Sequence, residues 1–300
     1  AFTGVGHATD RAITLGLEGF TPENYDEVKA SKALSRIQST HFLEPDGLGK
    51  LKFNTSEDLI FDYGPRLDEH SNGLILYAID HQGDVILEEI YFSIGGGFIL
   101  TKSEFSQQSP NEIGTEVPYP FKTAAEMLQM ARSSGKSIAE MKRDNEKALH
   151  SNAEIKDGLS RIWKTMDMCI KRGLENDGQL PGGLNVKRRA KGIYDALISE
   201  KGKNLTSPHT TNDWMSVYAM AVNEENAAGG QVVAAPTNGA AGVVPSVLRY
   251  YLDHVPTSSQ SKIEDFLLTA AAIGGLVKFN ASISGAEAGC QAEVGSASAM

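Results

Sequence analysis

Four short segments combine glycine with hydroxyl, amide or thiol side chains, groups that bind polar ligands and add little to an apolar core. They are Ser93-Ile94-Gly95-Gly96-Gly97-Phe98, Pro236-Thr237-Asn238-Gly239-Ala240, Asn280-Ala281-Ser282-Ile283-Ser284-Gly285 and Gly289-Cys290-Gln291. The three consecutive glycines follow a predicted strand, where exposed backbone N–H groups can hold a phosphate or a carboxylate. A tight turn or bulge at which the chain leaves the sheet is the alternative interpretation.

The second segment is predicted to be a loop, because residues 236–239 are strong turn formers. Residues 223–230 precede it closely and cluster amides, carboxylates and glycines between two apolar stretches. We expect this cluster to form the polar wall of a pocket. The alternative is a simple connection between two helices.

Two side chains outside these segments could move a proton or form a covalent bond. His7 lies where a loop enters a predicted helix, and the helix N-terminus would lower its pKa toward the neutral form of a general base. An exposed histidine without a function is the alternative. Lys278 lies in an apolar helix next to Asn280, so it could form a Schiff base with pyridoxal phosphate, or it could extend into solvent.

The two cysteines of the chain stand in different settings. Cys290 lies in a polar, glycine-rich stretch with Glu287 and Glu293 nearby, which favours a functional thiol over a small buried hydrophobic residue. Cys169 falls on the periodic apolar stripe of a predicted amphipathic helix that ends at Gly173, so we expect it in the core. Two cysteines argue against a disulfide framework and are too few to hold an iron-sulfur cluster.

Composition limits the class of protein. A chain of 300 residues, 41% hydrophobic and 22% charged, can bury a core and has the size at which two domains are common. A net charge of -10 with mixed signs gives no reason to expect nucleic acid or an anionic membrane as partner. No apolar run is long enough to span a membrane and no signal peptide is recognisable, so we expect a cytoplasmic protein.

The order of predicted elements indicates an α+β domain followed by an all-α domain. Residues 74–79 and 85–92 have strand character around the turn-forming residues 80–84, which predicts a hairpin, and residues 8–17 predict a helix. The prolines within residues 117–120 mark a linker. We therefore expect the α+β domain over residues 1–116 and the helical domain over residues 117–300.

Helix starts in the second half carry a specific sequence signal. The capping box, in which a hydroxyl and a carboxylate three residues later satisfy free backbone N–H groups, recurs four times. The pairs are Thr123 with Glu126, Ser137 with Glu140, Ser151 with Glu154, and Ser261 with Glu264. Each pair predicts the first turn of a helix.

At these polar segments the chain resembles the iron-sulfur-dependent L-serine dehydratases. The resemblance covers essentially the whole chain in the family order, which makes it far more specific than a single glycine motif. Its matches are Thr3-Gly4-Val5-Gly6-His7-Ala8-Thr9-Asp10, Tyr91-Phe92-Ser93-Ile94-Gly95-Gly96-Gly97-Phe98, Val117-Pro118-Tyr119-Pro120-Phe121, Leu180-Pro181-Gly182-Gly183-Leu184, Ala221-Val222-Asn223-Glu224-Glu225-Asn226-Ala227-Ala228-Gly229-Gly230, Ala235-Pro236-Thr237-Asn238-Gly239-Ala240 and Asn280-Ala281-Ser282-Ile283-Ser284-Gly285-Ala286-Glu287.

The resemblance implies an N-terminal α+β domain, called the β domain in this family, and a helical catalytic domain that holds a four-iron, four-sulfur (4Fe-4S) cluster. It also implies the conversion of L-serine to pyruvate and ammonia, in which an iron without a protein thiolate acts as Lewis acid on the hydroxyl while a base removes the α-proton. A homodimer is a further expectation. Neither nucleic acid nor a membrane is expected as a partner.

The resemblance also assigns roles to single residues. Cys290 matches the first of three cluster cysteines, and His7 matches a histidine that is the leading candidate for the general base. The positions expected to line the substrate site are Ser93, Gly95, Gly96, Gly97, Thr237, Asn238, Ser282 and Ser284.

Of three departures from the family pattern, two lead us to expect a chain truncated at both ends and inactive by itself. A Ser-Ser-Ser-His-Thr segment is absent before Ala1, and the other two cluster cysteines would lie beyond Met300. Ala241 and Ser298 stand where many members carry cysteine, a change expected to be tolerated. Two alternatives stay open, a non-catalytic or regulatory serine-binding subunit, and a pyridoxal-phosphate lyase that uses the glycine segment and Lys278.

Overall fold

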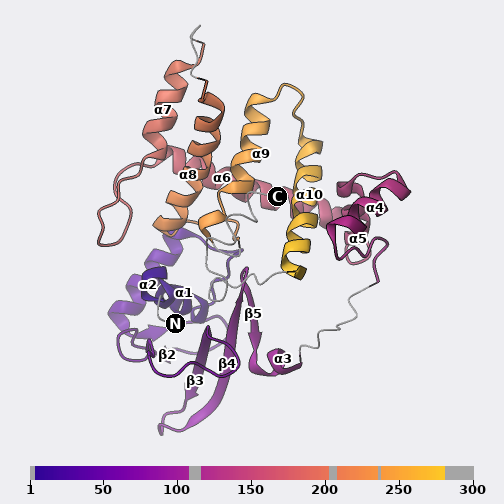
Figure 1. Cartoon of the computed structure of the whole chain (residues 1–300). Helices are drawn as coiled ribbons and strands as arrows, with labels where there is room; N and C mark the ends of the chain where they lie inside the picture. The colour runs from indigo at the N-terminus through magenta and orange to yellow at the C-terminus, as the bar shows by residue number, and fades with distance from the viewer. Residues whose placement is uncertain (1–3, 108–115, 203–207, 236–237, 281–300) are drawn as a thin grey trace. The chain divides into compact units, whose positions relative to one another are not determined.

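The computed structural model of the chain describes residues 4–107, 116–202, 208–235 and 238–280. Contacts divide the chain into two compact units, Ala1–Ser93 and Ile94–Met300. The sheet lies early in the sequence and most helices follow later, as expected (Figure 1). The domain boundary at residue 116 stays a prediction.

The first unit begins with helices and ends in a hairpin. Its elements are η1 (Val5–His7), α1 (Thr9–Leu17), α2 (Glu27–Thr40), β1 (Phe42–Leu43), β2 (Leu51–Lys52), β3 (Gly73–Ile79) and most of β4 (Val85–Gly95). The predicted helix over residues 8–17 is confirmed as α1. Helix α2 starts at the N-cap Asp26, whose side chain accepts a hydrogen bond from the N–H of Lys29, and it ends at His41 in the left-handed conformation.

The predicted hairpin is confirmed by the antiparallel pairing of β3 and β4, whose register runs from Gly73 opposite Phe92 to Ile79 opposite Val85. The Asp80 carboxylate accepts the N–H groups of Gln82 and Asp84 and so closes the turn. Strand β5 (Phe98–Thr101) completes a sheet of order β3-β4-β5.

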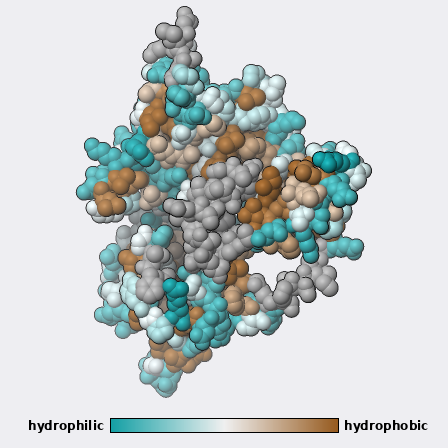
Figure 2. All heavy atoms as spheres, in the orientation of Figure 1, coloured by the Kyte–Doolittle hydropathy of each residue, from teal (hydrophilic) through white to brown (hydrophobic). Residues whose placement is uncertain are grey.

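Apolar side chains are exposed at the turn end of this hairpin. Four of them, Ile79, Val85, Ile86 and Leu87, are each at least 55% exposed. Figure 2 shows hydrophobic surface over this end of the hairpin.

The second unit is mainly helical. After β5 it contains α3 (Lys102–Gln107), α4 (Ala124–Ser134), α5 (Ile138–Glu146), α6 (Asn152–Glu175), α7 (Ala190–Glu200), α8 (Thr210–Ala228), η2 (Asn238–Ala240), α9 (Val243–His254) and α10 (Gln260–Asn280). None of the helices within the described residues has both the length and the apolar character needed to cross a membrane.

Three of the four predicted capping boxes are confirmed, at the starts of α4, α5 and α6. The fourth is wrong, because α10 already begins at Gln260 and Ser261 lies inside it. The Glu264 carboxylate instead accepts a hydrogen bond from Arg143 of α5 at 2.9 Å. The sequence pattern assigned the Glu264 carboxylate to a helix cap, but in the structure it forms a long-range ion pair with Arg143.

Helix α8 is the centre of this unit and packs against α6, α7 and α9, and Figure 1 shows it flanked by α7 and α9. Two glycines permit this close packing. A Cβ on Gly173 of α6 would overlap the carbonyl oxygen of Ala221, and one on Gly242 would lie 2.7 Å from the carbonyl oxygen of Ala219. The prediction that Gly173 ends α6 is wrong, because the helix continues to Glu175.

The core around α8 contains Cys169, which is 1% exposed, as predicted. It packs in one cluster with Ile170, Trp214, Val217 and Tyr218. Burying such side chains stabilises a fold by about 1.5–3 kcal/mol each. This core holds α8 rigidly, including the polar residues of its last turns.

Candidate functional site

The last turns of α8 carry two consecutive buried carboxylates. Glu224 is 5% exposed and Glu225 is 2% exposed. Successive residues of an α-helix project about 100° apart, so the two side chains leave α8 in different directions. Each carboxylate meets a different part of the second unit.

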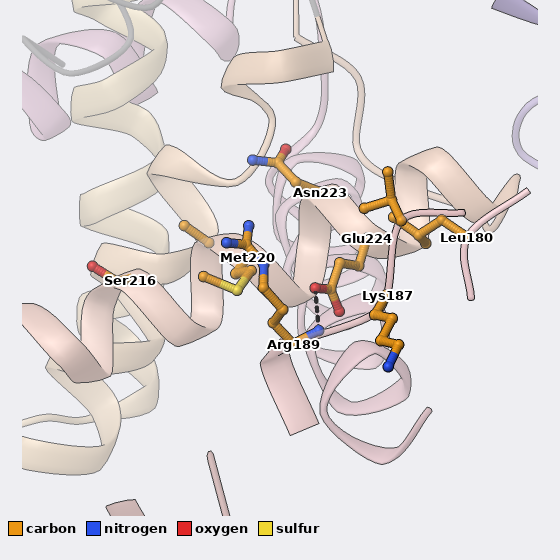
Figure 3. Close-up of a pocket in the computed structure, with 9 residues that line it drawn as sticks. Leu180, Lys187, Arg189, Ser216, Met220, Asn223 and Glu224 are labelled. Atoms are coloured by element: carbon orange, nitrogen blue, oxygen red, sulfur yellow. Dashed lines mark hydrogen bonds between the residues drawn. The ribbon is translucent and has the colours of Figure 1, made fainter. Parts of the chain in front are cut away.

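Glu224 lies at the start of α7. Its carboxylate accepts the backbone N–H of Arg189 at 2.7 Å and that of Ala190 at 3.3 Å, as the dashed line to Arg189 in Figure 3 shows. Arg189 is the N-cap of α7 and its own side chain makes no capping hydrogen bond. A carboxylate at this position satisfies free N–H groups and is favoured by the helix dipole, so Glu224 acts as a cap supplied by another helix.

Glu225 lies among three donors. Its carboxylate is 2.8 Å from Nη1 of Arg188, 3.1 Å from Nε of Arg172 and 3.2 Å from Nδ2 of Asn176. Burial acts to raise the pKa of Glu225, but the hydrogen bonds from Arg188, Asn176 and Arg172 outweigh it, so that this pKa is lowered. The site therefore holds an ionised, fully bonded carboxylate. A Cβ on Gly230 would lie 2.9 Å from this carboxylate, which explains the glycine there.

The segment between α6 and α7 folds back on itself as a short hairpin, residues 178–188. The N–H of Arg188 donates to the carbonyl of Gly178, and the N–H of Leu180 donates to that of Val186, both at 2.8 Å. Leu184, at its tip, is 88% exposed. Glu225 binds the side chain of Arg188, the last residue of the hairpin, and Glu224 binds the backbone N–H of Arg189. The two carboxylates therefore attach the end of the hairpin to α8.

A cavity of about 440 Å³ lies between this hairpin and α8 (Figure 3). Its lining mixes apolar, amide, carboxylate and cationic side chains. The lining residues are Leu180, Val186, Lys187, Arg189, Ser216, Ala219, Met220, Asn223 and Glu224. Asn223 and Glu224 belong to the segment predicted to form a polar pocket wall, and that prediction is confirmed for these two residues.

Asn238 lies next to the end of α8. Its Nδ2 donates to Oδ1 of Asn226 at 3.0 Å, and its Oδ1 accepts the N–H of Ala235 at 3.2 Å. The structure thus joins two segments that the sequence singled out separately. Thr237 lies outside the described residues.

The glycine segment forms the turn between β4 and β5. Gly95, Gly96 and Gly97 have φ angles of 96°, 62° and 81°, a left-handed conformation that only glycine adopts at little cost. The tight-turn interpretation is confirmed, while binding of an anion there stays a prediction. Lys278, at the end of α10, lies beside this turn with its Nζ 3.5 Å from the centroid of the Phe98 ring.

Ser93 and His7 lie in the first unit. Ser93 is an exposed residue of β4 whose N–H donates to the carbonyl of Asn72. His7 is exposed and ends η1 directly before α1, as the sequence predicted. The roles of both stay predictions. Ser282, Ser284 and Cys290 lie outside the described residues.

The described residues do not supply the ligands of an iron-sulfur cluster. Burial raises the pKa of the Cys169 thiol to about 11, so Cys169 stays protonated in the core and offers no thiolate. No group of three or more His, Cys, Asp or Glu side chains in the described part of the chain could hold a metal ion. The ligand role of Cys290 therefore stays a prediction.

Sequence reasoning missed the basic partners of Glu225. Arg188 stands in the run Lys187-Arg188-Arg189, which by itself is typical of a solvated face. A usable signal was the pair Glu224 and Glu225 one residue after the apolar Ala221 and Val222, because carboxylates on a buried helix face need partners.

Comparison with known proteins gives matches over both units. The serine dehydratase alpha chain family matches residues 133–300, and the serine dehydratase beta chain family matches residues 1–104. An L-serine dehydratase of Streptomyces coelicolor is 43% identical over 298 residues, 99% of this chain and 65% of the relative. L-serine dehydratases of Haemophilus influenzae and Escherichia coli (L-serine dehydratase 1) are each 42% identical over 100% of this chain and 65% of their own lengths.

The chain thus spans about 65% of the length of the curated relatives it matches. One family match covers more than half of the chain, and the other covers most of the rest. This chain belongs to the serine dehydratase family, with a beta-chain region followed by an alpha-chain region.

Proposed function

We propose that the protein converts L-serine to pyruvate and ammonia, the reaction of an L-serine ammonia-lyase. The observation that carries the proposal is 41–43% identity, over 99–100% of this chain, to eight proteins named L-serine dehydratase. The polar groups at the end of α8 and at the β4–β5 turn are compatible with a small zwitterionic substrate.

The reaction is an elimination of water. A base takes the α-proton and the C–H electrons form the double bond to the β-carbon. The β-hydroxyl leaves with its bonding electrons, takes up a proton from the protonated base or from solvent, and departs as water. The aminoacrylate that results tautomerises to an imine, and water hydrolyses this imine to pyruvate and ammonia. We assign the base to His7, which neighbours the start of a helix and is exposed to an incoming substrate.

Substrate binding is assigned to residues with amide, hydroxyl or backbone N–H donors. The amide of Asn238 is held by Asn226 and Ala235, so its orientation is fixed before substrate arrives. In the glycine turn no side chain covers the backbone, so its N–H groups can approach the carboxylate of a bound substrate. The full proposed set is Ser93, Gly95, Gly96, Gly97, Thr237, Asn238, Ser282 and Ser284.

We also propose a four-iron, four-sulfur cluster as cofactor, with Cys290 as one thiolate ligand. Since the chain has two cysteines and Cys169 is in the core, the further thiolates have to come from residues outside these 300. When bound, such a cluster supplies a Lewis acid for the leaving hydroxyl. A homodimer is the proposed assembly, which light scattering of the intact protein tests.

The test is pyruvate release from L-serine by the intact gene product, purified without oxygen. Activity that is lost in air and returns with ferrous iron and thiol would support both the reaction and the cluster. Activity that air does not affect would overturn the cluster. A yellow, active protein formed only with pyridoxal phosphate would replace this proposal with the pyridoxal lyase alternative.

A further inference from the structure

The ion cluster around Glu225 connects three separate parts of the second unit. Arg172 and Asn176 belong to α6, Arg188 to the hairpin that borders the cavity, and Glu225 itself to α8. Arg172 has a second contact, because its Nη2 donates to the carbonyl of Gln231 at 2.8 Å. The cluster therefore also holds the segment that follows α8.

That segment leads to Asn238. Arg172 fixes its beginning at Gln231, and Asn226, the neighbour of Glu225, accepts the Asn238 amide at its end. The guanidinium of Arg172 makes this link by donating from two different nitrogens, Nε to Glu225 and Nη2 to Gln231. A lysine would have to serve both acceptors from one ammonium nitrogen, so it lacks the planar, two-nitrogen geometry of this link.

Stability alone does not explain such a cluster. Replacing a buried ion pair by apolar side chains of similar volume is often neutral or stabilising, because taking charges out of water is costly. What a fully bonded network does provide is one defined arrangement of the groups attached to it. Here the attached groups are the cavity hairpin and the segment that carries Asn238.

We propose that Glu225, together with Arg172 and Arg188, is a positioning residue of the serine dehydratase site, which holds Asn238 and the cavity hairpin in place for the substrate. This inference rests on the proposed function. Glu225 has no contact with the substrate in this role. It acts through Arg172 on Gln231, whose segment leads to Asn238, and through Arg188 on the hairpin of residues 178–188.

The most informative variant is Arg172→Lys in the intact holoenzyme. The lysine keeps a positive charge opposite Glu225 but loses the bridge to Gln231. Misplacing a site group by about 1 Å can cost about 100-fold in rate. We therefore expect kcat/KM for L-serine to fall 10- to 100-fold, with a melting temperature close to that of the wild type.

Asp167→Asn is the matched control. Asp167 also lies on α6 and joins it to α9 through Arg249, at 2.7 Å. Glu225→Gln and Asp167→Asn both replace a carboxylate by an amide at an inter-helix ion pair. Glu225→Gln should lower kcat/KM at least 10-fold, whereas Asp167→Asn should change it less than 2-fold.

A double variant tests whether Arg172 acts through Asn238. If it does, adding Arg172→Lys to Asn238→Ala will cost little further activity, because the orientation that Arg172 maintains has already lost its function. The positioning role would be overturned if the two single losses of kcat/KM multiplied in the double variant, or if Asp167→Asn lowered kcat/KM as much as Glu225→Gln does. The proposed reaction would stand in either case. A wild-type holoenzyme that releases no pyruvate would overturn the proposed function, and the positioning role with it.

Discussion

The carboxylate of Glu225 lies 2.8 Å from the guanidinium of Arg188. Counting side-chain atoms alone, Glu225 is 3% exposed and Arg188 is 8% exposed, so both are almost completely buried. The two residues are 37 positions apart and belong to a helix and to the hairpin that borders the cavity. Removing one member of such a pair leaves the other charge in the interior without its full set of partners.

Arg188→Met should destabilise the protein by about 3 kcal/mol, because Glu225 stays buried with fewer donors. Urea unfolding of the wild type and the variant measures this difference. Lys191→Met is the control, since Lys191 pairs with Asp195 on the exposed face of α7 and such pairs contribute little. Equal stability of Arg188→Met and wild type would contradict a structural role for this pair.

Glu225 should also make stability depend on pH in the acid range. Its pKa in the folded protein is lowered from the ordinary value of 4.5, so the folded state binds a proton less readily than the unfolded state. The stabilisation is fully present above about pH 4.5 and is lost as the pH falls through the folded pKa. The free energy of unfolding should therefore fall less between pH 6 and pH 3 in Glu225→Gln than in the wild type. Urea unfolding curves at several pH values measure it.

His254 predicts a second pH dependence, nearer neutrality. Its Nε2 is buried without a hydrogen-bond partner among the described residues, and its ring lies against Trp214 and Tyr250. Burial, with smaller effects from Lys201 and Arg249, outweighs Asp253 and lowers the pKa of His254 below 6.5. Stability should thus decline as the pH falls below about 6.5.

His254→Phe keeps the ring stacking and removes the titrating group. The melting temperature of this variant should change less between pH 7.5 and pH 5.5 than that of the wild type. An identical pH dependence in both proteins would show that the His254 environment does not disfavour its charged form.

Gly173→Ala should destabilise the contact between α6 and α8 by about 1–3 kcal/mol, because the new Cβ overlaps the carbonyl oxygen of Ala221. Gly158→Ala is a control on the same helix, since a Cβ there meets nothing within 4 Å. An alanine in a helix with free space should be neutral or stabilise it by up to about 1 kcal/mol. Thermal unfolding compares the two, and equal effects would contradict the close helix approach.

Local elements were predictable from the sequence because their signals are local. The β3–β4 hairpin follows from turn residues between two apolar runs, and three capping boxes start helices where the hydroxyl and the glutamate predicted them. Cys169 was placed in the core by periodicity alone.

The errors arose where tertiary contacts override a local pattern. Glu264 pairs with Arg143, 121 residues away, and does not cap a helix. Gly173 was predicted to end a helix, but it permits the close packing of α6 against α8. Arg172 and Arg188 became recognisable only through the Glu225 carboxylate that they surround. Residue types marked the segments that hold the proposed site residues, but the roles of single residues came from the family resemblance, because one histidine or serine carries no signal of its role.

The most direct test of the central claim is the stoichiometry of serine breakdown by the intact, anaerobically purified protein. The proposed elimination predicts pyruvate and ammonia in a ratio of one to one, and slower release from L-serine deuterated at the α-carbon wherever proton removal limits the rate. If a protein with a fully assembled cluster released neither pyruvate nor ammonia from L-serine, that result would contradict the assignment of this chain to serine dehydration.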